Sequence, residues 1–256
     1  MSTTTAPPIL EADGLAKRYG SVHALQGATL SIRPGEIVAL VGDNGAGKST
    51  LVSILSGANK PTSGALRVDG EVVNFFSTLD ARAFGIETVY QDLALAPDLP
   101  VWANLFLGRE VRRKGVLGRL GWLDRKAMED RAATALMRTH IRIGSVHQLT
   151  GRLSGGQRQA VAVGRAAAWG SRVVLMDEPT AALGVEQQAE VANLIKDVAA
   201  SGTAVLLISH NIPQVHELCD RIFVLFQGRV IADLSPATAT VSDIVSAITG
   251  IAVVER

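Results

Sequence analysis

The chain has 256 residues, which is enough for one large domain or two small ones. With 47% hydrophobic residues it can bury a substantial core, which excludes a disordered tail and a disulfide-stapled miniprotein. The 25 Lys and Arg residues nearly balance the 24 Asp and Glu residues, which leaves a net charge of +1. Proteins that wrap nucleic acid usually show a clear basic excess, so we expect no nucleic-acid partner.

The mean hydropathy of +0.24 is high for a soluble protein. The longest apolar runs, such as residues 205–208 and 222–226, are nevertheless short, whereas a membrane-spanning helix needs about 20 residues. Short apolar runs rich in β-branched residues are typical of strands in a buried parallel sheet. The sequence therefore predicts that the chain does not cross a membrane and that its apolar residues lie in such a sheet.

Taken in order, the chain starts with residues 1–8, whose Ser, Thr and Pro content predicts a disordered tail rather than a signal peptide. The next residues, to about 35, and residues 63–74 predict short strands broken by glycine turns, which would form a small antiparallel layer. Strand candidates then alternate with helical patterns. These candidates are residues 36–41, 86–90, 172–176, 203–208 and 221–226. The alternation predicts an α/β fold with a mostly parallel sheet.

Residues 98–168 are mainly helical in pattern and predict a helical subdomain. We expect this subdomain to be inserted into a single domain that spans residues 9–250 and is followed by a C-terminal tail at residues 251–256. Within it, residues 109–126 hold seven basic and two acidic residues. This segment is either a solvated, glycine-broken loop or a contact with a partner or with lipid head groups at a membrane face. The single cysteine, Cys219, excludes an internal disulfide, fits a reducing compartment and is expected to serve packing.

A phosphate-binding motif occupies residues 42–49, which match the pattern G-x-x-x-x-G-K-[ST] between an apolar strand and a helical run. Glycines let backbone N–H groups turn toward phosphates, and the following helix N-terminus adds partial positive charge. Lys48 is expected to reach the β- and γ-phosphates, and the Ser49 hydroxyl to ligate Mg²⁺. The predicted nucleotide-binding residues of this loop are Gly42, Asp43, Asn44, Gly45, Ala46, Gly47, Lys48, Ser49 and Thr50.

A second motif is the apolar strand that ends in Asp177 and Glu178. Asp177 is expected to hold Mg²⁺ through water, and Glu178 to polarise an attacking water as general base. A kinase has less need of the second carboxylate because its acceptor comes from the substrate. The pair therefore favours nucleotide hydrolysis.

The third motif, Leu-Ser-Gly-Gly-Gln at residues 153–157, stands just before that strand and is followed by a basic, alanine-rich run. This motif resembles the signature sequence of the ATP-binding-cassette (ABC) ATPases. Together with the other two motifs, it gives a resemblance to that family over about residues 9–230. It implies a P-loop NTPase core of the α/β class with a mostly parallel sheet, an antiparallel β layer and an inserted helical subdomain. It also implies ATP and Mg²⁺ as ligands and ATPase activity.

The resemblance assigns roles to three further residues. Tyr19 matches the aromatic that stacks on adenine. Gln91 matches a glutamine that coordinates Mg²⁺, responds to the partner protein and contributes to catalysis. His210 matches the switch histidine that contacts the γ-phosphate.

The signature residues are Leu153, Ser154, Gly155, Gly156 and Gln157. Ser154 is a good N-cap, and the two glycines leave N–H groups bare at a helix N-terminus, which makes an anion site. Because the chain already has a phosphate site, the resemblance implies a head-to-tail homodimer in which each signature acts on the partner's ATP. Gly184 stands where the family usually has an aspartate, which puts communication between the two sites in doubt rather than hydrolysis.

Residues 41–51, 55–57 and 104–110 resemble the single-cassette monosaccharide importers of the ribose, xylose and fructose type. The resemblance implies a peripheral subunit on the cytoplasmic face of the inner membrane, with separate transmembrane permease subunits and, indirectly, a periplasmic sugar-binding protein as partners. An apolar face around residues 93–102 is expected to receive the permease. The alternatives are a cassette for an amino acid, nucleoside or lipid, a soluble ABC ATPase acting on ribosomes or DNA, and a P-loop kinase, which the signature and His210 disfavour.

Overall fold

The computed structural model describes residues 6–138, 143–169, 171–181 and 183–250. The predicted tails at 1–8 and 251–256 lie outside the described residues, except for residues 6–8. The chain divides into two compact units. The first unit comprises Met1–Thr88, Ser171–Pro179 and Val198–Arg256, and the second comprises Val89–Gly170 and Thr180–Asp197.

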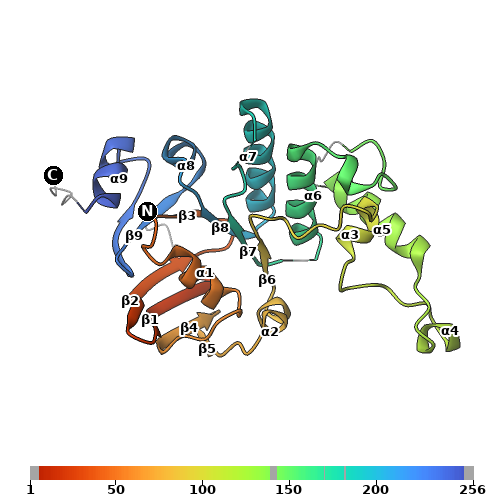
Figure 1. Ribbon diagram of the computed structural model, residues 1–256, viewed down its shortest axis with the longest axis horizontal. Helices are drawn as coiled ribbons and strands as arrows, with labels where there is room; N and C mark the ends of the chain where they lie inside the picture. The colour runs from red at the N-terminus through yellow and green to blue at the C-terminus, as the bar shows by residue number, and fades with distance from the viewer. Residues whose placement is uncertain (1–5, 139–142, 170, 182, 251–256) are drawn as a thin grey trace. The chain divides into compact units, whose positions relative to one another are not determined.

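The first unit contains the predicted antiparallel layer, a four-stranded sheet in the order β2-β1-β4-β5 (Figure 1). Its strands are β1 (Leu10–Tyr19), β2 (Val22–Ile32), β4 (Ser63–Val68) and β5 (Glu71–Val73). The prediction of short strands was wrong for β1 and β2, which have 10 and 11 residues. Gly14 and Gly27 lie at register shifts between them, with φ of 59° and 90°. These glycines therefore form bulges within long strands, and not the turns that the sequence suggested.

The six-stranded sheet has the order β10-β9-β3-β8-β7-β6. Its strands are β3 (Ile37–Val41), β6 (Ile86–Val89), β7 (Val173–Asp177), β8 (Ala204–Ile208), β9 (Arg221–Phe226) and β10 (Arg229–Leu234). The first five match the predicted strands to within one residue, and β9, β3, β8 and β7 are parallel neighbours. β10 was not predicted, and it pairs antiparallel with β9 at the sheet edge. The predicted α/β fold with a mostly parallel sheet is confirmed.

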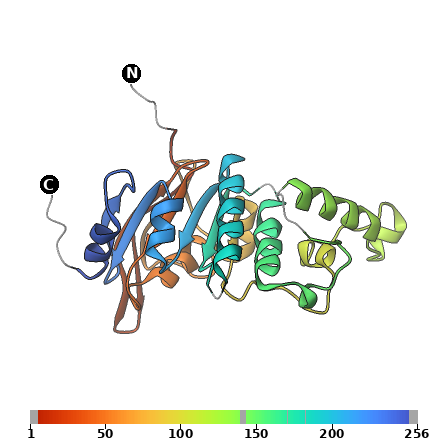
Figure 2. The same cartoon turned by 90° about the horizontal axis from the view of Figure 1, so that it is seen from above.

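The parallel strands β3, β7, β8 and β9 are buried along nearly their whole length, and every residue of β3 and β8 is buried. Helix α1 (Lys48–Leu55) lies beside the strands of the first unit (Figures 1 and 2). One apolar core joins both sheets with this helix. The first unit also holds α2 (Thr78–Ala83), α8 (Ile212–Leu218) and α9 (Val241–Ile248). This burial accounts for the high mean hydropathy, because β-branched and leucine-rich strands covered on both faces need no polar side.

The second unit is mainly helical, as its sequence pattern predicts. It contains α3 (Val101–Leu105), α4 (Val116–Arg119), α5 (Arg125–Arg138), a 3₁₀ turn (Thr150–Arg152) and α6 (Gly155–Ala167). Helix α7 (Val185–Ala200) begins in this unit and ends in the first. Its predicted apolar face is buried, with Val191, Leu194, Ile195 and Val198 all at most 5% exposed. A separate core lies among α3, α5 and α6.

A buried polar network stands at the centre of the second unit. Asn104 is completely buried, and its Oδ1 accepts a hydrogen bond of 2.7 Å from the Ala96 amide. Its Nδ2 lies 3.0 Å from the Ala96 carbonyl, 3.2 Å from the Leu99 carbonyl and 3.2 Å from the Thr150 hydroxyl. Thr150, also completely buried, donates its own hydroxyl to the Ala96 carbonyl at 2.7 Å. Asn104 thereby joins the segment before α3 to the turn before α6.

Among the residues described, no helix is both long enough and apolar enough to cross a bilayer. Cys219, directly after α8, is buried, and burial raises the pKa of its thiol. The thiol therefore stays protonated and unreactive at neutral pH, which agrees with the packing role expected for it.

Candidate nucleotide-hydrolysis site

Three predicted motifs follow the carboxyl ends of adjacent parallel strands in the first unit. The phosphate loop follows β3, His210 follows β8, and Asp177 ends β7, in the sheet order β3-β8-β7. The register places Leu40 beside Ile208 and Ile208 beside Asp177. Parallel strands with this register end at a common edge, so motifs far apart in the sequence meet there.

The glycines of the phosphate loop are required by close backbone contacts. A Cβ at Gly42 would lie 2.2 Å from the Leu225 carbonyl oxygen, and a Cβ at Gly47 would lie 2.5 Å from the Ala24 carbonyl oxygen. Gly47 has φ 107° and is the N-cap of α1, without a side-chain cap hydrogen bond. The first amides of α1 therefore meet no capping side chain and suit an anion such as phosphate.

Lys48 already lies across this loop. Its Nζ donates to the Gly42 carbonyl at 2.7 Å and to the Asp43 carbonyl at 3.0 Å. The loop is braced further by a 2.8 Å hydrogen bond from the Gly228 amide to the Ala46 carbonyl. The ammonium group is thus held at the loop by two backbone carbonyls.

Glu178 and His210 contact each other at the same edge of the sheet. His210 Nδ1 lies 2.8 Å from Glu178 Oε1, and the side chains are 77% and 16% exposed, respectively. Glu178 has φ 51°, uncommon for a residue other than glycine, and its amide donates to the Ile208 carbonyl at 2.9 Å. The turned backbone directs the carboxylate toward His210. One imidazole nitrogen is therefore engaged by a carboxylate, a contact that fixes the ring's orientation.

Asp177 lies in an environment that disfavours its charge. Burial, followed by the nearby Glu178 carboxylate, raises the pKa of Asp177, while Lys48 acts in the opposite direction. No group of three or more metal-ligating side chains occurs in the described part of the chain. Two carboxylates beside a phosphate loop and an exposed Ser49 hydroxyl nevertheless fit a magnesium ion that arrives with nucleotide phosphates, because Mg²⁺ is usually shared between one or two carboxylates and the substrate.

Tyr19, at the end of β1, belongs to the first unit and is 45% exposed. Lys17 Nζ lies 5.0 Å from the centre of its ring. An exposed ring surface of this kind is suited to stacking on a nucleobase.

The predicted signature residues lie in the second unit, at the start of α6. Ser154 is the N-cap, and it exchanges hydrogen bonds with Gln157, whose amide donates to Ser154 Oγ at 3.2 Å. A Cβ at Gly155 would lie 3.2 Å from Leu183 Cδ2, and a Cβ at Gly156 would lie 3.1 Å from Gln187 Cβ. These glycines therefore permit close packing against the segment that contains Gly184, in addition to exposing helix amides. Leu153 is buried.

Gln91 also lies in the second unit, and it is exposed. In the turn that follows it, Leu93 and Ala94 have φ of 61° and 44°. Arg165 of α6 donates to the carbonyls of both residues, at 2.9 Å and 2.8 Å. Sequence reasoning missed Arg165, because only the fold places it beside a turn more than 70 residues away.

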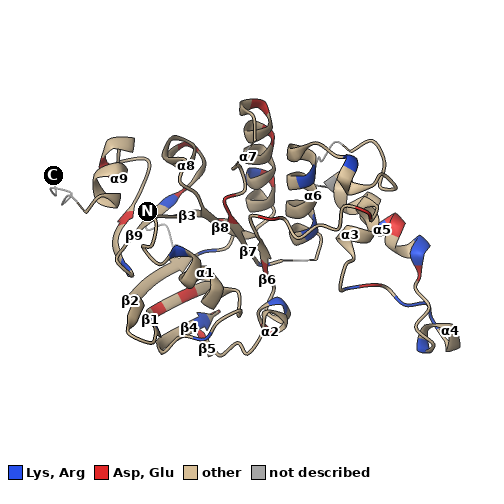
Figure 3. Cartoon of the chain, in the orientation of Figure 1, with Lys and Arg blue, Asp and Glu red and all other residues tan. Residues whose placement is uncertain are grey.

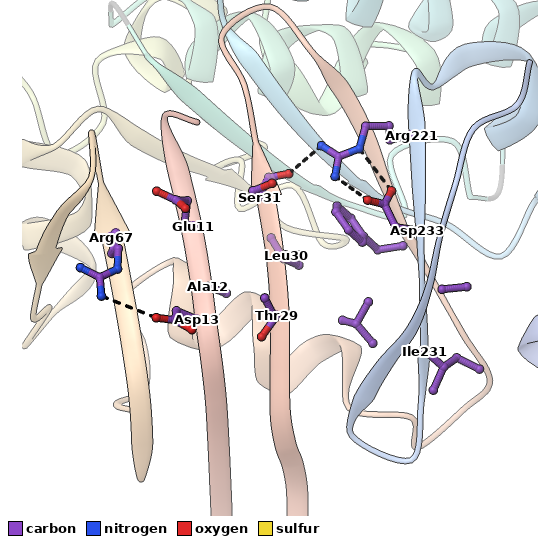
Figure 4. A pocket seen from close by; sticks show the side chains of 13 residues that line it. Glu11, Ala12, Asp13, Thr29, Leu30, Ser31, Arg67, Arg221, Ile231 and Asp233 are labelled. Carbon is purple, nitrogen blue, oxygen red and sulfur yellow. Dashed lines mark hydrogen bonds and ion pairs between the residues drawn. The ribbon is translucent and has the colours of Figure 1, made fainter. Parts of the chain in front are cut away.

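A separate hollow of about 470 Å³ lies between β1, β2, β9 and β10 (Figure 4). Its arginines are paired with acidic side chains: Arg67 with Asp13 at 3.5 Å, and Arg221 with Asp233 at 2.7 Å. None of the predicted site residues lines it. Because its arginines are neutralised by carboxylates, it offers no clear anion site.

The fold and the sheet-edge site define a P-loop nucleotide-binding cassette. The family model described as ABC transporter matches residues 25–181. The chain is 50% identical to the fructose import ATP-binding protein FrcA of Rhizobium meliloti, over 95% of this chain and 94% of that protein. The xylose/arabinose import ATP-binding protein XylG of Sulfolobus acidocaldarius is 46% identical, over 95% of each chain. The chain belongs to the ABC transporter family.

A similar solved structure is the dimeric form of MJ0796, a bacterial ABC transporter cassette. It has a TM-score of 0.73 and 26% identity, and the match covers 89% of this chain and 98% of the other. The family membership and the fold likeness agree with the P-loop NTPase fold that the sequence predicts, and the family's ligands are ATP and Mg²⁺.

Proposed function

We propose that this chain is the ATP-hydrolysing subunit of a monosaccharide importer, in which a homodimer powers separate permease subunits. The contact between Glu178 and His210, at the sheet edge that carries the phosphate loop, supports hydrolysis most directly. Two relatives named for import of fructose and of xylose or arabinose favour a sugar as the solute.

In this proposal the loop amides and Lys48 bind the phosphates, and Tyr19 stacks on adenine. Ser49 and Asp177 would hold Mg²⁺, which would neutralise phosphate charge, and Gln91 is the further ligand that the family resemblance implies. Glu178 accepts a proton from the attacking water, and His210 holds the Glu178 carboxylate in place and contacts the γ-phosphate. The proton thus goes to the Glu178 oxygen as the water oxygen attacks the γ-phosphorus, and the bond from that phosphorus to the bridging oxygen breaks, so that ADP leaves and phosphate is formed.

The second phosphate contact comes from another copy of the chain. Gly155 and Gly156 present backbone amides at the start of α6, where Ser154 caps only the Gln157 amide, and this helix N-terminus suits the phosphate of the partner's ATP. The dimeric MJ0796 cassette supports such an assembly. Because the two copies are identical, both ATP sites are equivalent by symmetry.

The permease is proposed to dock on the second unit, at the cytoplasmic face of the membrane, with sugar delivered by a periplasmic binding protein. Leu95 and Trp102 pack partly buried against the core of this unit, in the segment expected to receive the permease. Nearby core residues also line a hollow of about 490 Å³, mostly apolar, that includes Leu105, Phe106 and Trp169. A partly buried apolar segment together with a hollow of this kind suits a helix from a membrane partner.

Hydrolysis is tested with Glu178→Gln, which removes the general base and keeps the shape of the side chain. We expect the variant to bind ATP like the parent and to lose turnover by at least about a hundredfold. Glu217→Gln, an exposed position on α8, is the matched control and should retain full activity. Turnover of Glu178→Gln at the parental rate would show that Glu178 is not the base.

The solute is tested by uptake in the source cells after deletion of this gene. We expect uptake of labelled fructose, xylose or ribose to fall, and to be restored by the parental gene but not by Glu178→Gln. If uptake of all three sugars is unchanged while that of an amino acid, nucleoside or lipid falls, the alternative transport function replaces sugar import.

A further inference from the structure

Residues 111–124 of the second unit, called here the α4 hairpin, form an ordered projection between α3 and α5 (Figure 1). Arg112 pairs antiparallel with Leu123, and the Arg113 amide donates to the Trp122 carbonyl at 2.9 Å. A 2.7 Å hydrogen bond from the Asp124 amide to the Val111 carbonyl closes the base of the hairpin. The hairpin therefore has a defined backbone.

The tip of the α4 hairpin exposes large apolar side chains. Val116 is 72% exposed, Leu120 is 70% exposed and Trp122 is 58% exposed, while Leu117 and Leu123 are each 45% exposed. Five such side chains within eight residues are unusual on a surface that faces only water. Their clustering indicates that something covers them in the working protein.

The same hairpin is strongly basic. Between residues 111 and 123 the sequence has four basic residues and no acidic residue. Figure 3 shows basic residues along the loop that leads from α3 to α4. Within the described part of the chain, no carboxylate pairs with the side chains of Arg112, Arg113, Lys114 or Arg119, and all four residues are exposed.

The acidic residues at the hairpin base do not neutralise this charge. Glu110 accepts a hydrogen bond from the Gly108 amide at 3.0 Å, and Asp124 accepts one from the Ala127 amide at 3.1 Å. Both carboxylates thus serve the local backbone. The hairpin presents positive charge together with exposed aliphatic and indole groups, and its cross-strand pairs set Arg112 opposite Leu123 and Arg113 opposite Trp122.

We propose that the α4 hairpin binds the surface of a bilayer that contains anionic phospholipids. Arginine and lysine are attracted to the negative headgroups, while tryptophan and leucine side chains enter the boundary between headgroups and acyl chains. This occupant matches both features of the hairpin, whereas a purely acidic protein surface would leave the apolar side chains uncovered. The interaction goes beyond the proposed function, because it anchors the cassette to lipid independently of the permease.

The test measures sedimentation of the full chain with vesicles that contain no protein. One set is phosphatidylcholine alone, and the other contains roughly 30% phosphatidylglycerol. We expect binding to the anionic vesicles to be at least about tenfold stronger, and to weaken as salt is raised. Two variants remove one feature each: Arg112→Glu with Arg113→Glu and Lys114→Glu, and Leu120→Ser with Trp122→Ser. Each is expected to reduce binding at least about tenfold.

The matched control combines Leu79→Ser with Lys196→Glu, because Leu79 is 68% exposed on α2 and Lys196 is exposed on α7. The control should bind anionic vesicles like the parent. Far-UV circular dichroism and the thermal midpoint verify that every variant is folded, and a failure of ATP hydrolysis would not alter the vesicle result.

Absence of parental binding to the anionic vesicles overturns the proposal, as does undiminished binding of both hairpin variants. If the variants bind vesicles normally but lose sugar uptake in the assembled importer, the hairpin contacts the permease instead, and the lipid proposal is wrong.

Discussion

Replacing the buried Asn104 with alanine should destabilise the second unit strongly, even though Asn104 lies outside the three nucleotide motifs. The substitution removes an acceptor 2.7 Å from the Ala96 amide and a donor group that serves the Leu99 carbonyl and the Thr150 hydroxyl. The carbonyls of Ala96 and Leu99 retain the Thr150 hydroxyl as a partner. The Ala96 amide, however, loses the side-chain acceptor that it has in the parent.

The magnitude follows from these contacts. An orphaned buried donor costs about 1–3 kcal/mol, and each lost amide hydrogen bond costs about 1 kcal/mol more. The space left by the amide adds a packing term, so we expect a loss of about 3–5 kcal/mol in the free energy of unfolding. Asn104→Asp should also be destabilising. It keeps the oxygen that accepts from the Ala96 amide, but it replaces the donor Nδ2 with a second oxygen, which backbone carbonyl oxygens repel.

The chain offers a selective probe for this measurement, because its tryptophans, Trp102, Trp122 and Trp169, all lie in the second unit. Urea unfolding followed by tryptophan fluorescence therefore reports on that unit. The matched control is Asn193→Ala, an exposed position on α7 in the same unit, which should be neutral or slightly stabilising. If Asn104→Ala lost less than about 1 kcal/mol, the network would contribute little and our reasoning would be refuted.

Four further substitutions probe the site. Asp177→Asn should raise the thermal midpoint of the nucleotide-free chain at pH 7 while abolishing metal-dependent turnover. Burial and Glu178 raise the pKa of Asp177 in the folded chain above 3.8, so the parent loses stability as the pH rises from 3.8 through this raised pKa. The difference in thermal midpoint between variant and parent should therefore shrink in acid. Arg165→Gln should leave basal hydrolysis within about twofold but reduce its stimulation by the permease, as measured in proteoliposomes, because two hydrogen bonds to the turn after Gln91 are lost. Ser154→Ala should cost about 1 kcal/mol of stability and reduce hydrolysis without weakening ATP binding by the isolated monomer; weaker monomer binding would mean that the signature acts within its own chain. Gly184→Asp should fold normally, since a Cβ there meets no atom within 4 Å, and a higher Hill coefficient for ATP hydrolysis would show that the missing carboxylate links the two sites.

Much of the fold could be predicted because its signals are local. The parallel strands are short runs of apolar residues buried on both faces, so their limits coincide with changes in hydropathy to within one residue. β10 escaped prediction because its burial alternates along the sheet edge, which leaves no continuous apolar run. The glycines of β1 and β2 were misinterpreted because a glycine with positive φ serves a bulge or a turn equally well, and only the register of the partner strand distinguishes them.

The candidate site shows the same division between local and distant causes. Arg158 and Arg165 lie in one basic, alanine-rich helix, and nothing in their sequence surroundings separates them. Arg158 donates to the Leu153 carbonyl at 2.9 Å, a contact within the signature itself. Arg165, two helical turns later, reaches instead to the carbonyls of Leu93 and Ala94. The motif predicts that the helix begins with an anion site, but the fold decides which arginine ties that helix to the turn after Gln91. A residue that links two motifs therefore belongs to neither of them in sequence, and only the three-dimensional arrangement reveals it.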